Sequence, residues 1–477
     1  MQETPLHPRL ARAALLAGSV ALLAGCASVP HLGAEPMAKP AASYAVTQSF
    51  AAPDGNWPSD QWWTAYGDAQ LDGLVTEALA GAPSLAEAEA RVRRAQSFAE
   101  QSGAVLKPQL AAEASVMETK QSLNQGVPSA FVPHGWREVG RAGLDLSWQL
   151  DLFGKNRALL AAATSEVEAA RADAALARLR LSTGVAGAYA DLTQLYADRD
   201  AAEGALRIRR EGERLIAQRA AQGLETRAAL ERAHAGRAGV EAELARIDEA
   251  IGLTRNGLAA LLGQGPDRGL AIGRPSPRAI RALGLPQNLA ADLVGRRPDV
   301  VAARLAAEAA GHRIKAAKAD FYPNVNLVGF VGVQSLGLDM LAKSGSTLGA
   351  VGPAVSLPIF SGGRLEGAYR GARADYDTAV AAYDATLVQA LRDVADAAVS
   401  SRALDARLAK SREAAAASQA AYDLSRDRYG RGLGTYLDVL VAEDGLIADR
   451  RTVADLETRA FTLDVALVRA LGGGFRA

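Results

Sequence analysis

The sequence predicts a mainly α-helical protein that also carries membrane β-strands, built from one unit that occurs twice along the chain. Three observations predict this class. Pro, Phe, Arg and Gly residues recur in the same order in the two halves, two long stretches lack proline, and short segments alternate between apolar and polar residues. The repeat predicts that the chain consists of two similar halves. The proline-free stretches predict long helices, and the alternation predicts strands.

Residues 1–25 have the layout of a secretory signal peptide, in which Arg9 and Arg12 precede a short apolar run. The run has about a dozen residues, fewer than the roughly 20 that a membrane-spanning helix needs. It ends at Cys26, the only cysteine in the chain.

The stretch from Leu23 to Cys26 resembles the lipobox of bacterial lipoproteins, in which the cysteine is acylated and becomes the new N-terminus. Ala27 follows the cysteine, which in such lipoproteins favours sorting to the outer membrane. We therefore expect a lipid on Cys26 that anchors the chain to that membrane. The alternative is an ordinary signal peptide with an incidental cysteine.

The composition argues against several functions. Lys and Arg number 53 and Asp and Glu also number 53, so the charge gives no reason to expect nucleic acid as a partner. Aromatic residues make up only 5% while alanine is abundant, which favours long helices packed closely together. No apolar run is long enough for a membrane-spanning helix, so a chain that crosses a membrane would do so as strands of a closed barrel.

The internal repeat is long and has constant offsets over three successive segments. The matches include Pro108 with Pro323, Phe153 with Phe360, Arg157 with Arg364, and Gly223 with Gly432. Constant offsets within each segment indicate a duplication whose length changes lie in loops. The predicted parts after the signal peptide are an acylated linker (26–60), a first repeat (61–265), an inter-repeat linker (266–290) and a second repeat (291–477).

Each repeat is predicted to contain a helix, two strands and two very long helices. The first helices are expected at 84–105 and 299–319, with Ser84 and Asp299 as N-caps just after a proline.

The long helices follow from the absence of proline between Pro133 and Pro266 and after Pro358. Helices of this length point to a coiled coil or a helical barrel. We expect the two helices of each repeat to form a hairpin, with tips near Asp198–Gly204 and Ser400–Asp405.

The strands are predicted from alternation that is clearest at 144–151 and looser at 351–358, with fainter strands before them at 109–119 and 323–334. We expect the apolar side chains to face lipid; they are Leu144, Leu146, Trp148, Leu150, Val351, Val355 and Leu357. The alternative is a half-buried strand of a soluble sheet.

Four strands are too few to close a membrane barrel, and open strand edges do not occur in lipid. We therefore expect several copies of the chain to share one barrel, and three copies give twelve strands.

Several motifs together resemble the outer membrane factor family of TolC-like channels, and within it the NodT or OprM-like lipoproteins. They are Trp62-Trp63 with Tyr66-Gly67-Asp68, Leu150 to Gly154, Arg296 to Val300, Leu357 to Gly363, and Tyr429 to Leu440. The resemblance implies a homotrimer with a twelve-stranded outer membrane β-barrel on a long periplasmic α-helical barrel. It also implies an exit duct of a tripartite efflux system, joined to a periplasmic adaptor and an inner membrane pump. Glu225 departs from the small residue that this family has there, so adaptor contacts at the first hairpin are expected to differ.

No catalytic site, metal site or cofactor is predicted apart from the lipid on Cys26. The five histidines are dispersed and the chain has no GxxxxGK[ST] phosphate loop. By analogy with this family's gate, acidic and basic residues close to the expected hairpin tips are predicted to close the duct. They are Asp393, Asp396, Arg402 and Asp405 in the second repeat, and Asp191 and Asp198 in the first. The alternative is that all of them are solvated surface charges.

The sequence argues against two other functions and leaves a third open. A periplasmic adaptor would have one hairpin and a strand-rich domain, and an outer membrane enzyme would need a catalytic set; neither pattern is present. Export of a protein by a type I secretion system shares the expected fold, so the sequence leaves it open as the alternative to efflux of small toxic solutes.

Overall fold

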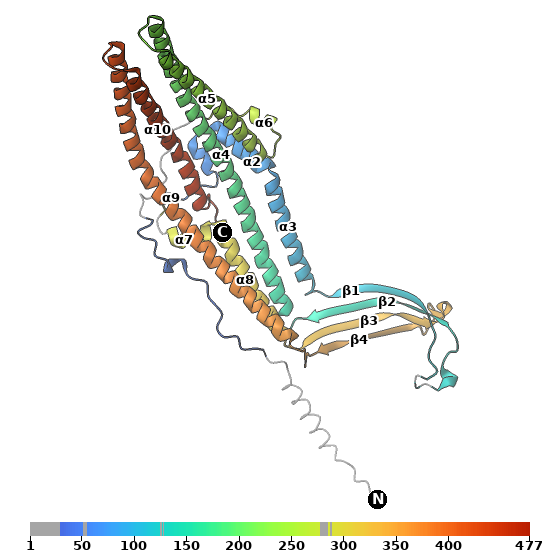
Figure 1. Cartoon of the computed structure of the whole chain (residues 1–477). Coiled ribbons are helices and arrows are strands. Elements are labelled where there is room, and N and C mark those ends of the chain that lie inside the picture. The colour runs from blue at the N-terminus through green and yellow to red at the C-terminus, as the bar shows by residue number, and fades with distance from the viewer. Residues whose placement is uncertain (1–28, 51–54, 125, 127, 277–284, 287–288) are drawn as a thin grey trace. The chain divides into compact units, whose positions relative to one another are not determined.

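The computed structural model describes residues 29–50, 55–124, 126, 128–276, 285–286 and 289–477. The predicted signal peptide and Cys26 lie outside these residues. Helices dominate the described chain and four strands form a single sheet, so the mainly helical class predicted from the sequence is confirmed (Figure 1).

The same order of elements occurs twice along the chain. In the first half the elements are η2 (Trp62–Tyr66), α2 (Ala69–Gly81), α3 (Pro83–Ala104), β1 (Gln109–Thr119), β2 (Arg137–Leu150), α4 (Lys155–Ala221) and α5 (Arg227–Leu261). In the second half they are α6 (Asp267–Leu270), α7 (Leu289–Arg296), α8 (Pro298–Ala319), β3 (Asn324–Leu336), β4 (Thr347–Ser356), α9 (Arg364–Gly430) and α10 (Tyr436–Ala470). Both α4 and α9 have 67 residues, and both α5 and α10 have 35.

The helices α3 and α8 begin at prolines, so the prediction that Ser84 and Asp299 are N-caps is wrong. Pro83 and Pro298 are the first helical residues, a position where proline is favoured because its missing N–H has no partner to lose. Asp299 lies in the first turn and instead accepts hydrogen bonds from Arg297.

The predicted hairpin tips are also wrong. Helix α4 continues through 198–204 and α9 continues through 400–405. Gly, Ser and Asp weaken a helix by less than about 1 kcal/mol each, and packing overrides this: Ala202 and Leu404 are buried at these levels.

The turns of the hairpins lie about 20 to 30 residues further along, at 222–226 and 431–435. Gly223 and Gly432 end their helices at φ of 70° and 73°, in the left-handed region that glycine adopts without strain. Thr226 and Thr435 then cap α5 and α10 by accepting backbone N–H groups.

The chain divides into two compact units. The first comprises Val92–Ala169 and Ala303–Ala382 with the stretch that ends at Ala38. It contains the antiparallel sheet, whose strand order is β1-β2-β3-β4. Strand β2 starts seven residues before the predicted segment, because its pairing with β1 continues to Arg137.

The second unit comprises Lys39–Arg91, Ala170–Ala302 and Tyr383–Ala477, and it contains both hairpin turns. Its main core is built from α2, α4, α5 and α10, with buried residues that include Leu71, Leu74, Val185, Tyr189, Ile247, Leu258 and Phe461. Helix α2 was not predicted, although Asp68 caps it through hydrogen bonds from the N–H groups of Gln70 and Leu71.

Candidate functional site

The sheet of the first unit has one apolar face. The register places Leu146 opposite Leu110 and Gly329, and Gly329 opposite Val351. Because paired residues of an antiparallel sheet point to the same side, the alternate residues of all four strands share one face. Six of the seven residues predicted to face lipid lie on it: Leu144, Leu146, Trp148, Leu150, Val351 and Val355.

The seventh, Leu357, lies just beyond the sheet, so its orientation toward lipid stays a prediction. Strand β4 ends at Ser356, which is opposite Asn324, the first residue of β3, so Leu357 has no residue opposite it in the sheet.

The opposite face of the sheet carries most of the polar side chains of the strands, together with a few apolar ones such as Val328 and Phe330. It carries Glu113, Ser115, Arg141, Asp145, Ser147, Gln149 and Asn326, which alternate with the apolar set. The Arg141 guanidinium lies 4.2 Å from the ring centroid of Phe330 and 3.9 Å from Asp145 Oδ1. One face therefore suits an apolar medium and the other suits water.

Both outer strands of the sheet have an open edge. Among the described strands, β1 pairs only with β2 and β4 pairs only with β3. Each outer strand therefore presents a row of backbone N–H and C=O groups to a further strand.

Aromatic side chains gather where the strands meet the helices. The rings of Phe153 and Tyr322 stack with centroids 5.0 Å apart at 14°, and Phe360 is 91% exposed. Exposed aromatic residues at the end of a membrane strand are typical of the lipid headgroup region.

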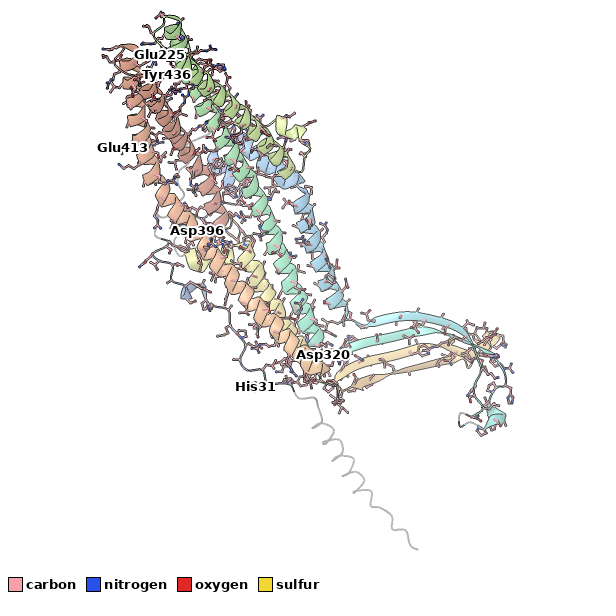
Figure 2. All side chains as sticks on the ribbon, viewed as in Figure 1. His31, Glu225, Asp320, Asp396, Glu413 and Tyr436 are labelled. Carbon is pink, nitrogen blue, oxygen red and sulfur yellow. The ribbon has the colours of Figure 1, made fainter. Side chains whose placement is uncertain are left out.

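The two hairpin tips of the second unit lie against each other (Figure 2). The hydroxyl of Tyr429, near the end of α9, donates to Glu225 Oε1 in the first turn at 2.7 Å. Burial and the Glu225 carboxylate both raise the pKa of Tyr429. The Arg219 guanidinium lies 4.6 Å from the centroid of the same ring. Glu225, which replaces the small residue expected at this position, thus contacts the second hairpin through Tyr429.

Below the tips, a buried ion pair joins the hairpins. Arg209 Nε on α4 lies 3.0 Å from Glu443 Oε1 on α10, and Glu443 is 2% exposed. Burial raises the pKa of Glu443 to about 6, although the charge of Arg209 opposes this rise. Arg209 also contacts the carboxylate of the exposed Asp444.

Four of the six predicted gate residues lie on α9, and the prediction that they sit beside a hairpin tip is wrong. Asp396 lies partway along the helix, far from the tips that Glu225 and Tyr436 mark (Figure 2). It forms an exposed pair with Arg392, with 3.3 Å between Arg392 Nε and Asp396 Oδ2. Arg402 and Asp405 are exposed one to three turns further along α9.

Asp393 has a structural contact that the sequence did not reveal. Its carboxylate accepts a hydrogen bond of 2.9 Å from the buried Arg297 and one of 2.7 Å from Gln389. Arg297 also donates to Asp299 and to the carbonyl oxygens of Ala390 and Ala470. This arginine therefore fastens the start of α8 to α9 and to the end of α10.

The first-half residues Asp191 and Asp198 lie in the middle of α4, also far from the tip. Burial raises the pKa of both side chains. The Gln194 amide links Asp198 to α10. It donates a 3.2 Å hydrogen bond to Asp198 and also donates to Asp455 on α10. The charge of Asp455 raises the pKa of Asp198 further.

The residues that the structure describes contain no group of three or more His, Cys, Asp and Glu side chains placed to hold a metal ion. Among the described helices, none combines the length and the apolar character that crossing a membrane requires.

Comparison with known proteins gives concordant results. The family model described as outer membrane efflux protein matches residues 74–264 and 289–473. The outer membrane protein VceC from Vibrio cholerae has a solved structure that is 47% identical, with a TM-score of 0.84, over 88% of this chain and 100% of that one.

Two further relatives carry names of resistance proteins. The multidrug resistance outer membrane protein MdtP of Escherichia coli K12 is 29% identical over 96% of both chains. The fusaric acid resistance protein FusA of Burkholderia cepacia is 38% identical over 65% of this chain, which spans only 59% of that relative. The chain thus belongs to the outer membrane efflux protein family, and it is an efflux channel protein of the bacterial outer membrane.

Proposed function

We propose that three copies of this chain form the outer membrane exit duct of a tripartite efflux system. The amphipathic four-stranded sheet with two open edges carries this proposal. Unpaired edges are too costly in lipid, and four strands are too few to close a barrel, whereas three copies supply twelve. The polar face would then line the pore and the apolar face would contact lipid. The equal lengths of α4 and α9, and of α5 and α10, support the duplication of one ancestral unit.

The lipid on Cys26 is part of the proposal. The stretch before Ala38 lies along α9, since the carbonyl oxygen of Ala34 accepts from Arg373 and Glu35 lies 3.8 Å from the same side chain. Cys26 precedes Ala34 by eight residues, a span of at most about 27 Å when extended. Arg373 is nine residues along α9, or about 13 Å from its first residue. A lipid on Cys26 is thus within reach of the membrane that holds the strands.

This anchor is tested by labelling cells with radioactive palmitate. The wild-type protein should incorporate the label and Cys26→Ser should not. A wild-type protein without label would disprove the anchor but leave the channel intact, because the strands themselves supply membrane affinity.

The hairpin tips are the proposed contact with the periplasmic adaptor, which in turn would join the inner membrane pump. Large apolar side chains are exposed there: Leu224 at 61%, Leu433 at 67%, Leu437 at 59% and Val441 at 65%. Exposed apolar patches of this kind mark protein contacts. Energy for transport would come from the pump, since the chain contains no phosphate-binding loop.

We also propose that a ring of carboxylates lines a narrow part of the duct. Of the predicted residues, Asp198 has the surroundings that support it best, because a second carboxylate, Asp455, faces it from α10 and threefold symmetry would triple both. Rings of carboxylates favour cations in a narrow pore. In planar bilayers, Asp198→Ala should lower cation selectivity. Glu413→Ala removes an exposed carboxylate from α9 that is not one of the predicted gate residues, and it should leave the selectivity unchanged. Equal selectivity of both variants and the wild type would remove Asp198 from the proposal.

Small toxic solutes are the proposed substrates, as the names of MdtP and FusA suggest for those relatives. Deletion of the gene should raise the accumulation of a fluorescent dye in the cells and their sensitivity to drugs, and the intact gene should restore both. Unchanged accumulation, together with loss of a secreted protein from the medium, would instead support the alternative of a type I secretion duct.

A further inference from the structure

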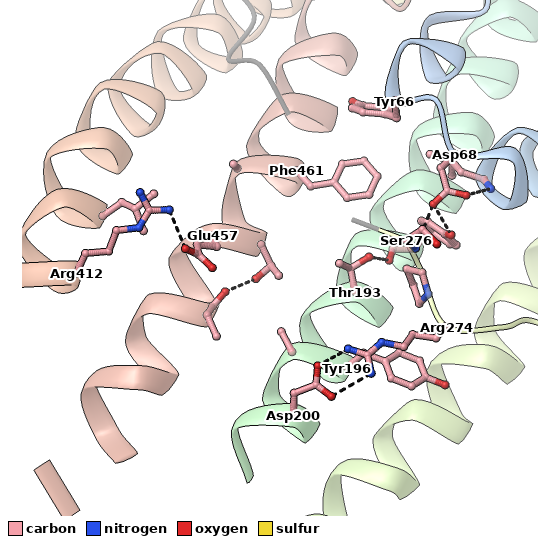
Figure 3. Close-up of a pocket in the computed structure, with 18 residues that line it drawn as sticks. Tyr66, Asp68, Thr193, Tyr196, Asp200, Arg274, Ser276, Arg412, Glu457 and Phe461 are labelled. Atoms are coloured by element: carbon pink, nitrogen blue, oxygen red, sulfur yellow. Dashed lines mark hydrogen bonds and ion pairs between the residues drawn. The ribbon is translucent and has the colours of Figure 1, made fainter. Parts of the chain in front are cut away.

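The second unit contains a cavity of about 450 Å³ that the sheet and the hairpin tips do not use (Figure 3). It lies between α4 and α10, with further walls from η2, the start of α2, α9 and the segment 274–276. We propose that this cavity binds a neutral, planar aromatic solute. The proposal does not rest on the function proposed above, because binding is measured on the purified protein.

The shape of the cavity follows from two facing helix surfaces. Its lining residues on α4 include 193, 196, 197 and 200, and those on α10 include 454, 457, 458 and 461. Both sets have the i, i+3, i+4, i+7 spacing of a single helix face. Small residues, Ala197 and Ala454, occupy one position on each face, which leaves room between the helices. Pockets of roughly 300–1,000 Å³ are the usual size for drug-like ligands.

Aromatic rings form one wall of the cavity. The centroid of Phe461 lies 4.7 Å from that of Tyr66 and 6.5 Å from that of Tyr189. Tyr196 lines the opposite side, with the Arg274 guanidinium 5.4 Å from its centroid. Ring faces and edges in these arrangements favour a flat aromatic guest, which can stack or pack edge to face.

The charged groups that line the cavity are already paired with protein atoms. Arg274 forms two hydrogen bonds with Asp200, and Arg412 donates to Glu457 at 2.7 Å. The remaining carboxylate, Asp68, accepts from the Tyr189 hydroxyl at 2.8 Å and from the N–H groups of α2.

The two threonine hydroxyls of the lining are hydrogen-bonded as well. Thr193 donates to the carbonyl oxygen of Tyr189 at 2.9 Å, and Thr458 donates to that of Ala454 at 3.0 Å. Three carboxylates and two arginines line the cavity, and both arginines already pair with carboxylates, so an anionic guest would meet an excess of negative charge. A neutral aromatic guest needs only to displace water from the aromatic wall, and it disturbs none of these pairs. The lining therefore disfavours an anion and suits a neutral aromatic compound.

The experiment measures saturation transfer from the full-length protein in lipid nanodiscs to 2-naphthol, with empty nanodiscs as the blank. The wild type should give a signal above the blank. Ala454→Trp and Ala197→Trp fill the cavity from the two facing helices and should each abolish that excess. Arg459→Trp adds the same side chain to an exposed position on α10 outside the cavity, so it should keep the wild-type signal.

Circular dichroism identifies any variant that fails to fold. If one of the two cavity-filling variants does not fold, the signal of the other one tests the proposal. A wild-type signal equal to that of empty discs overturns the proposal, and it is the outcome expected if a second copy of the chain already fills the cavity. A signal that survives both cavity-filling substitutions also overturns it, because the naphthol then binds elsewhere.

Discussion

The hydroxyl of Tyr429 donates a 2.7 Å hydrogen bond to the carboxylate of Glu225, and this bond ties the end of α9 to the turn of the other hairpin. The two residues are 204 positions apart in the chain. Tyr429 is 2% exposed and Glu225 is half-buried, so water reaches the hydrogen bond only from the side of Glu225. The tips of the two hairpins are thus held together by a polar contact at their far end.

Loss of this bond should weaken the association of the tips. Tyr429→Phe and Glu225→Ala should each destabilise the helical region by about 1 kcal/mol, the usual value of one such bond. The double variant should cost little more than either single one, because the two changes remove the same bond. Denaturant unfolding followed by circular dichroism measures the coupling, with the exposed Glu231→Ala as the control. Additive effects of the two changes would show that the bond contributes nothing.

Arg297 is predicted to be the most sensitive charged position among those described above. It is 7% exposed and donates to two carboxylates and two carbonyl oxygens. Arg297→Ala would leave Asp299 and Asp393 without their shared cation, which typically costs about 3–5 kcal/mol. The neighbouring Arg296→Ala removes only a contact over the Trp57 ring and should cost about 1 kcal/mol or less. Equal midpoints of thermal unfolding for the two variants would contradict this account.

Glu443 should give the helical hairpins a specific pH dependence. Its pKa in the folded chain is about 6, above its ordinary value of 4.5, so the folded chain holds this proton more tightly than the unfolded chain. The protonated side chain therefore contributes stability that is fully present below about pH 4.5 and is lost as the pH rises through about 6. The loss is about 2 kcal/mol.

The groups that face Glu443 are Arg209 on α4, Tyr422 on α9, and Tyr436 and Asp444 on α10. Unfolding midpoints measured between pH 4 and pH 7.5 should fall with pH in the wild type and fall less in Glu443→Gln. Glu413→Gln, which removes an exposed carboxylate from α9, should keep the wild-type slope. Identical slopes for all three proteins would show that Glu443 does not titrate in this range.

Gly332 is predicted to be essential for pairing of β2 with β3. It is opposite Gly143 in the register, and a Cβ on Gly332 would lie 2.6 Å from the Cα of Gly143. Backbone at that distance cannot move aside as a flexible side chain would. Gly332→Ala should therefore lower the amount of assembled protein in the membrane, as judged by heat-dependent migration on gels. Gly352→Ala in β4 is the matched control, since a Cβ there meets nothing within 4 Å. Normal assembly of Gly332→Ala would mean that the sheet adjusts at this point.

The sheet was largely predictable from the sequence because the alternation of side chains is local. Leu144 to Leu150 alternate without exception, and the register then places Val351 and Val355 on the same face. The end of β4 before Leu357 was not predictable in this way, because it depends on where the partner strand begins, which is not a local property.

The hairpin tips and the buried charges were not predictable in the same way. The stretches at 198–204 and 400–405 contain residues that weaken helices, but packing of Ala202 and Leu404 keeps the helices intact. The Gly223 and Gly432 motifs were visible as repeat matches, and their glycines would have located the turns. A charged residue on a long helix resembles a surface residue, so nothing local distinguishes the buried Glu443 from the exposed Glu413.

The central claim is that the open edges of β1 and β4 pair with the edges of other copies to close a shared barrel. Native mass spectrometry of the full-length protein, released from detergent micelles, tests this most directly. The account predicts a single assembly with the mass of three chains, and strand content by circular dichroism equal to that of the protein in membranes. A monomer that keeps its full strand content would contradict it, because four strands with two open edges would then be stable without partners.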